Sequence, residues 1–126
     1  MYFKKMLKGS FSEVIEKTIS GFQEIGFGLI TEIDMDKKLY EKLDVKVKPY
    51  KILGICNPGF AYKALQLEPD VGVFLPCKVI VKEINESESE VVAMDPSVVM
   101  NMLNNKELSL LADEVTNKIK SVVNNL

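Results

Sequence analysis

The chain of 126 residues contains neither histidine nor arginine. Without histidine, Ser-His-Asp triads and Cys-His pairs are excluded, together with histidine general bases and histidine metal ligands. All 16 basic residues are lysines, and they are scattered along the chain rather than clustered. Lysine lacks the flat, forked donor group with which arginine binds phosphates and guanine bases. We therefore expect no nucleic-acid partner.

Long apolar runs are also missing from the sequence. No stretch approaches the ~18 consecutive apolar residues of a membrane-spanning helix, and residues 1–11 lack the apolar segment of a signal peptide. We therefore expect a cytoplasmic protein without a membrane partner, in which the two cysteines are reduced thiols. The 47% hydrophobic and 27% charged residues, with a net charge of -2, are typical of a soluble globular protein. The length predicts a single domain over residues 1–126.

The centre of the sequence, residues 54–83, contains both cysteines and three of the five prolines. The short apolar run Tyr50–Cys56, which leads into it, is typical of a strand buried on both faces. Asn57 is a good N-cap, and Pro58 fits the first position of a helix because it lacks only an amide hydrogen that would be unpaired there. We therefore expect a helix from Pro58 to about Leu67.

The next segment, Val71–Glu83, alternates apolar and other residues and predicts a second strand, in which Cys77 faces the core. Pro76 cannot donate to a sheet ladder, so its position is predicted to be a bulge, a bend or a sheet edge. Cys56 ends the preceding strand directly before a helix N-terminus, where the helix dipole and free amides favour a thiolate. If the two strands are neighbours, the two thiols come close in space.

The other helices carry recognisable start signals. Ser10 and Glu13 fit a capping box that begins a long amphipathic helix ending at Gly26. Asp95-Pro96 repeats the cap and proline of the central stretch, and a last long helix begins at about Lys106. The remaining elements expected are strands over Tyr2–Leu7, Phe27–Asp34 and Val91–Met94, and a short helix from a cap at Asp36 to Leu43. A polar turn joins Val91–Met94 to the Cys77–Ile84 part of the preceding strand. This order predicts an α+β domain whose mainly antiparallel sheet is packed on one face by the two long helices.

Several short motifs occur together in this pattern. They are Cys56-Asn57-Pro58 followed by Ala61, Ala64 and Leu65, then Gly72 to Leu75 leading into Leu75-Pro76-Cys77, and later Met94-Asp95-Pro96. Together they resemble the domain of unknown function 302 family over most of the chain. The resemblance implies a curved antiparallel sheet that cradles helices in the manner of TATA-box-binding-protein-like domains, with a β-α-β-β-β-β-α core and short extra helices. It also implies a tendency to form homodimers, but no activity, cofactor or catalytic residue.

The candidate site residues are Cys56, Asn57, Cys77 and Asp95. The simplest interpretation of the cysteines is that both pack in the core as small hydrophobic residues. Alternatively they form a redox pair or a soft-metal site, with four thiols of a two-fold dimer around zinc or two thiols around Cu(I). The helix cap accounts for Asp95, and a catalytic role would require a partner acid or base that the sequence does not identify.

These observations lead to three hypotheses about function. The principal one is a homodimeric ligand-binding or interaction module without catalytic activity, which takes a small molecule into a groove between sheet and helices. The alternative is a thiol-based redox or soft-metal-binding protein that uses Cys56 and Cys77. The third is an enzyme whose acid-base chemistry uses Asp95, Glu68 or a lysine. The sequence indicates no particular cofactor.

Overall fold

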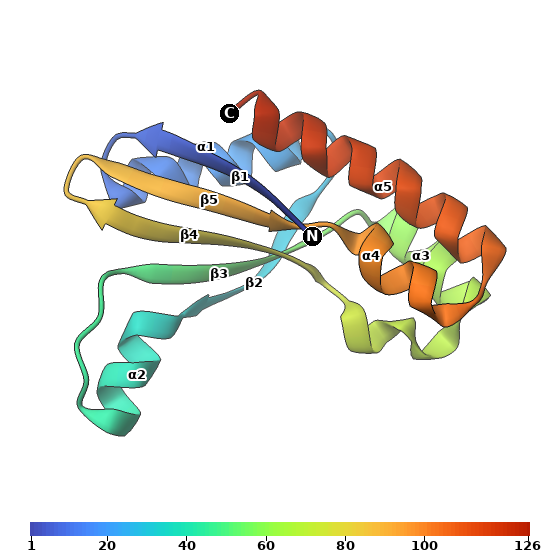
Figure 1. The fold of residues 1–126 in the computed structure, drawn as a ribbon, viewed down its shortest axis with the longest axis horizontal. Helices are drawn as coiled ribbons and strands as arrows, with labels where there is room; N and C mark the ends of the chain where they lie inside the picture. The colour runs from blue at the N-terminus through green and yellow to red at the C-terminus, as the bar shows by residue number, and fades with distance from the viewer.

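The chain folds around one five-stranded sheet with the strand order β1-β5-β4-β3-β2 (Figure 1). The structure is a computed structural model, and it describes residues 1–126. All four strand pairings are antiparallel, and the sheet is open because its edge strands β1 and β2 do not pair with each other. The strands are β1 (Tyr2–Lys8), β2 (Gly28–Asp34), β3 (Tyr50–Cys56), β4 (Cys77–Asn85) and β5 (Glu88–Met94). The predicted α+β class and antiparallel sheet are confirmed.

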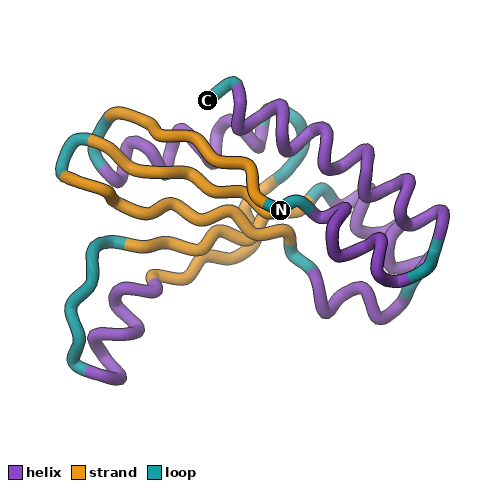
Figure 2. Tube along the Cα trace, viewed as in Figure 1, coloured by secondary structure: helices purple, strands orange, loops and turns teal.

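Helices lie between most of these strands and after the last one (Figure 2). They are α1 (Phe11–Gln23), α2 (Met35–Leu43), α3 (Pro58–Leu67), α4 (Pro96–Met100) and α5 (Lys106–Asn124), with short 3₁₀ helices η1 (Pro69–Phe74) and η2 (Asn101–Leu103). The two long helices, α1 and α5, pack on the same face of the sheet, as the sequence predicts. None of the helices is both long and apolar enough to span a bilayer.

The main core lies between α1, α5 and the sheet face that they cover. Alternation along the strands turns Val79 and Val81 of β4 toward the helices, where they pack with Phe22 of α1 and Ile119 of α5. Leu53 of β3 is completely buried in the same cluster. Full burial of a side chain of this size contributes about 1.5–3 kcal/mol, so this layer provides much of the stability of the fold.

Local capping explains where three of the helices begin. The N-cap oxygens of Ser10, Asn57 and Asn105 each accept a hydrogen bond from the backbone N–H three residues later, at 3.1–3.2 Å. Each bond satisfies an amide that has no partner within its helix, and such a cap contributes about 1 kcal/mol. Only half of the predicted capping box forms at Ser10, because the Glu13 side chain makes no hydrogen bond back to it.

The predicted strand over Val71–Glu83 is wrong in its first half. Residues 69–74 form η1, and β4 begins only at Cys77. Pro69 fixes a helical φ at the start of η1, and the three-residue period turns Val71 and Phe74 inward while Val73 is 79% exposed. The alternation of Val71 and Val73 is typical of a strand, but both residues belong to the 3₁₀ helix η1. Of the three alternatives predicted for Pro76, the bend is confirmed, because the chain bends at residue 76 directly before β4.

Two short helices also differ from the expectation. Asp34, not Asp36, is the N-cap of α2, and the Asp36 carboxylate instead accepts a hydrogen bond from the backbone N–H of Tyr50 at 3.1 Å. After Asp95, α4 ends at Met100 and continues as the 3₁₀ helix η2. The change of period buries Met100 and leaves Met102 exposed.

Helix α2 stands apart from the other helices and continues into a loop over residues 44–49, and the two together are called the arm (Figure 1). Tyr40, Leu43, Val45 and Val47 of the arm are each at least 45% exposed. The Asp36 hydrogen bond ties the start of α2 to the start of β3. The arm therefore presents four apolar side chains that are largely exposed to solvent.

Replacing Gly54 with alanine should destabilise the protein. A Cβ built at Gly54 would overlap Thr31 Cγ2 and lie 2.7 Å from Pro76 Cγ, so both the Thr31 side chain and the rigid Pro76 ring must shift. We expect a loss of about 1–3 kcal/mol in the free energy of unfolding, measured by urea titration. Gly28→Ala is the matched control, because a Cβ there meets nothing within 4 Å. Equal stability of both variants would contradict this account.

Candidate functional site

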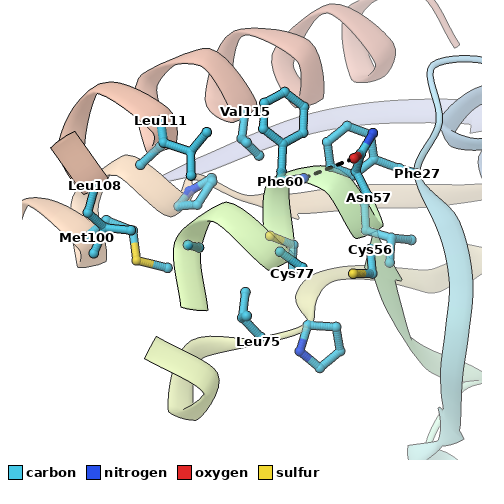
Figure 3. A pocket seen from close by; sticks show the side chains of 16 residues that line it. Phe27, Cys56, Asn57, Phe60, Leu75, Cys77, Met100, Leu108, Leu111 and Val115 are labelled. Atoms are coloured by element: carbon cyan, nitrogen blue, oxygen red, sulfur yellow. Dashed lines mark hydrogen bonds between the residues drawn. The ribbon is translucent and has the colours of Figure 1, made fainter. Parts of the chain in front are cut away.

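An apolar pocket lies between the ends of β3 and β4 and the helices α3, α4 and α5 (Figure 3). Of its 16 lining residues, 13 are hydrophobic. The lining residues are Phe27, Ile55, Cys56, Asn57, Phe60, Ala61, Ala64, Leu75, Pro76, Cys77, Pro96, Met100, Leu108, Leu111, Ala112 and Val115. Three of the four predicted site residues, Cys56, Asn57 and Cys77, therefore meet here, whereas Asp95 does not line the pocket.

The register of β3 against β4 brings the two cysteines to this pocket. Ile55 pairs with Cys77, and Cys56 is the next residue along β3. Cys77 is buried and Cys56 is half-buried, and neither forms a disulfide. The expected proximity of the two thiols is confirmed, since both side chains line the same pocket (Figure 3).

Asn57 joins the end of β3 to α3 and acts as a cap. Its Oδ1 accepts a hydrogen bond from the N–H of Phe60 at 3.2 Å, which is drawn as a dashed line in Figure 3. This turn holds the Phe60 ring stacked on Phe27 with 6.1 Å between ring centroids. By capping α3, Asn57 therefore fixes the position of Phe60 in the wall of the pocket.

Both thiols of the pocket are protonated near neutral pH. Burial raises the pKa of Cys77 from 9.0 to about 11, and the negative charge of an ionised Cys56 adds to this increase. The positive charge of Lys78 lowers the pKa of Cys77 by a smaller amount. Burial also raises the pKa of Cys56, so the expected thiolate is wrong. Pro58 has no N–H, and the N–H of Phe60 is bonded to Asn57, so few amides at the start of α3 remain to stabilise a thiolate.

Asp95 is held by hydrogen bonds beside the pocket. Its Oδ1 accepts from Ser97 N at 3.0 Å, from Ser97 Oγ at 2.6 Å and from Thr116 Oγ1 at 2.9 Å. Burial raises the pKa of Asp95, but the hydrogen bonds from Ser97 and Thr116 outweigh it, and the net pKa lies below the ordinary 3.8. Asp95 thus links α4 to α5 and positions Pro96, which follows it and lines the pocket.

The pocket is small and holds few possible metal ligands. Its volume is about 50 Å³, far below the ~300–1,000 Å³ of typical sites for drug-sized ligands. No three histidine, cysteine, aspartate or glutamate residues are grouped so that they could hold a metal ion. The groups of the pocket suited to a soft metal are the two thiols and the thioether of Met100.

Sequence reasoning missed most of the pocket walls. Leu108 and Val115 fit only the apolar stripe of a helix, and no pattern singled out Met100, because apolar periodicity does not distinguish a cavity wall from packed core. Phe27 and Phe60 are far apart in the sequence and meet only through the pairing of β2 with β3.

Comparisons with known proteins identify related sequences and folds. The family model described as "Domain of unknown function DUF302" matches residues 3–126. A solved structure, the uncharacterized conserved protein DUF302 from Bacillus stearothermophilus, is similar with a TM-score of 0.84 and 27% sequence identity. The match covers 97% of this chain and 96% of that one. No curated protein matches this sequence.

Charge on Asp95 should stabilise the fold in a pH-dependent manner. Because the folded pKa is lowered, this stabilisation is present above the ordinary pKa near 3.8 and is lost as the pH falls through the folded value. Asp95→Asn, which keeps a capping oxygen but removes the charge, should lower stability at pH 7 by about 1 kcal/mol and lose less stability than the wild type between pH 5 and pH 3.

Urea titrations across this pH range measure the effect. Asp113→Asn is the control, because Asp113 is an exposed carboxylate of α5 that makes no hydrogen bond. Identical pH profiles for wild type and Asp95→Asn would show that the charge on Asp95 contributes nothing.

Proposed function

This chain belongs to the DUF302 family, and we propose that it is a non-catalytic binding module whose pocket takes a small apolar ligand, or the apolar end of a larger one. The observation that carries the proposal is the lining, in which 13 of 16 residues are hydrophobic yet leave an unfilled space. Protein interiors are normally close-packed, so a cavity among this many apolar side chains forfeits packing energy. A ligand that fills it would recover these contacts.

The size of the pocket limits what it can accept. A dry apolar cavity of about 150 Å³ in another protein binds benzene or xenon, and this pocket has about one third of that volume. The occupant is therefore a single small apolar group, such as the methyl or thioether end of a longer molecule. Several lining residues, among them Cys56, Leu75 and Leu111, are only half-buried, so a longer ligand could extend from the pocket to the surface.

The chemistry of the lining favours binding over catalysis. The two thiols have raised pKa values and are poor nucleophiles at neutral pH. Asn57 uses its oxygen as a helix cap, and the Asp95 carboxylate beside the pocket accepts hydrogen bonds from Ser97 and Thr116. No pair of groups in the lining is suited to act as general acid and base.

A thiol-based function is the second candidate, and one observation favours it. Cys56 and Cys77 line the same pocket, and ionisation of one raises the pKa of the other, so the sulfurs are close enough to interact. Two thiolates suffice for a Cu(I) ion, which prefers soft sulfur ligands. The apolar surroundings would shield such an ion from water.

We also propose that the module is a homodimer in solution. Four apolar side chains of the arm, Tyr40, Leu43, Val45 and Val47, are exposed, and the backbone groups along the outer edges of β1 and β2 make no ladder hydrogen bonds. Exposed apolar groups and open strand edges are surfaces through which protein subunits associate. The subunit number is a readout separate from pocket binding.

Xenon, a single apolar atom, is a direct probe of the pocket. We expect saturable shifts of the methyl resonances of Ile55, Leu108 and Val115 in ¹³C-methyl spectra under xenon pressure. Ala64→Val should abolish these shifts by filling the space, whereas Leu110→Ala, on the exposed side of α5, should leave them unchanged. The proposal fails if no methyl shift saturates, or if a folded Ala64→Val protein responds as the wild type does.

Native mass spectrometry of the same samples gives the subunit number. A monomer in every sample would contradict the homodimer but not the proposed binding in the pocket.

Copper retention tests the thiol candidate. If both sulfurs bind Cu(I), the reduced protein should hold one equivalent against bicinchoninic acid, and Cys56→Ser and Cys77→Ser should each lose it. Binding should strengthen as the pH rises, because both thiols must release protons whose pKa values are raised. Retention by either single variant, or none by the wild type, excludes a two-thiol site. Ala64→Val, which keeps both cysteines, is the control for the shape of the pocket.

A further inference from the structure

The sheet face opposite α1 and α5, here called the open face, contains a second concavity. It has a volume of about 410 Å³, which lies within the ~300–1,000 Å³ of small-molecule sites. Its lining residues come from four neighbouring strands and are Tyr2, Lys4, Tyr50, Lys78, Ile80, Lys82, Val92 and Met94. None of them lines the pocket between sheet and helices.

The strand register joins these residues into one surface. Val92 of β5 pairs with Lys4 of β1 on one side and with Ile80 of β4 on the other. Tyr2 pairs with Met94, which lies two residues from Val92 on the same face of β5. Ile80, Val92 and Met94 thus form a continuous apolar floor, with a tyrosine at two of its borders.

Three lysines, Lys4, Lys78 and Lys82, line the same concavity as this apolar floor. Lys82 forms an ion pair with Glu90, with 3.1 Å between Nζ and Oε1. Lys4 and Lys78 have no carboxylate partner: Lys4 Nζ lies 5.8 Å from the Tyr2 ring centroid, and Lys78 Nζ donates only to the Pro76 carbonyl oxygen at 3.4 Å. The aliphatic parts of lysine side chains cover apolar surface while their ammonium groups stay in water. Two unpaired cations therefore flank β5, one from each neighbouring strand.

We propose that the open face binds a small amphiphilic anion. Its carboxylate, sulfonate or phosphate group interacts with Lys4 and Lys78, and its apolar body lies on Ile80, Val92 and Met94. Charge complementarity selects the head group, because the concavity contains three lysines and no acidic residue. The apolar floor selects the body, since its burial removes apolar surface from water.

The size and charge of the surface favour a small molecule over a polyanion. Nucleic-acid binding relies on many phosphate contacts along a strand, and here only two ammonium groups are free of a carboxylate. The chain has a net charge of -2, which opposes a large anionic partner. Binding of an acidic peptide or an oligonucleotide is the alternative, and competition with these polymers tests it.

The probe is 8-anilinonaphthalene-1-sulfonate, compared with N-phenyl-1-naphthylamine, which has the same ring system without the sulfonate. Wild-type protein should bind the sulfonate with increased fluorescence, and added salt should weaken this binding by screening the lysines. The Lys4→Gln/Lys78→Gln variant should bind about tenfold more weakly. The matched control is Lys17→Gln/Lys118→Gln, which removes two exposed charges from α1 and α5 and should bind as the wild type does.

Three results would overturn the proposal. The first is unchanged binding in the Lys4→Gln/Lys78→Gln variant, and the second is equal affinity for the neutral probe. The third is displacement of the sulfonate by an oligonucleotide or an acidic peptide at lower concentration than by decyl phosphate, which would make a polymer the partner. Ala64→Val separates the two sites: if it alone abolishes fluorescence, the probe occupies the pocket between sheet and helices, and the open face is not the site.

Discussion

Pairing between β3 and β4 is the interaction on which the candidate pocket depends. The register that sets Ile55 opposite Cys77 brings both thiols to one end of the sheet. It also seats the Pro76 ring against Gly54, a position where any side chain would collide with Pro76 or Thr31. At the pocket β3 therefore ends beside the start of β4, and α3 begins directly after β3. Helix α5 completes the enclosure from the opposite side.

The pocket between sheet and helices and the concavity of the open face differ in the interactions that would hold a ligand. The pocket between sheet and helices is small, apolar and lined by protonated thiols, so dispersion and burial dominate any binding there. The open face is larger and carries lysines above an apolar floor, so a ligand there needs both charge and apolar surface. The sheet separates the two, and they share no lining residue.

Much of the fold was predictable because its signals are local. Caps at Ser10, Asn57 and Asp95 lie in the sequence next to the helices that they begin, and the apolar stripe of α5 is long and regular. Errors arose where local patterns are degenerate. The valines at 71 and 73 fit a strand as well as a 3₁₀ turn, and only tertiary packing buries one while exposing the other. The pocket walls depend on contacts between distant segments, which a single sequence does not reveal.

Because side chains alternate along β4, this one strand lines both the pocket and the open face. Cys77 turns toward the helices, whereas Lys78, Ile80 and Lys82 turn to the open face. Gaining or losing one residue between Pro76 and Lys82 would exchange the two sets, placing ammonium groups in the core and valines in water. Insertions and deletions should therefore be tolerated at the exposed hairpin tip around Ser87 but not between Pro76 and Lys82, where only substitutions preserve the alternation.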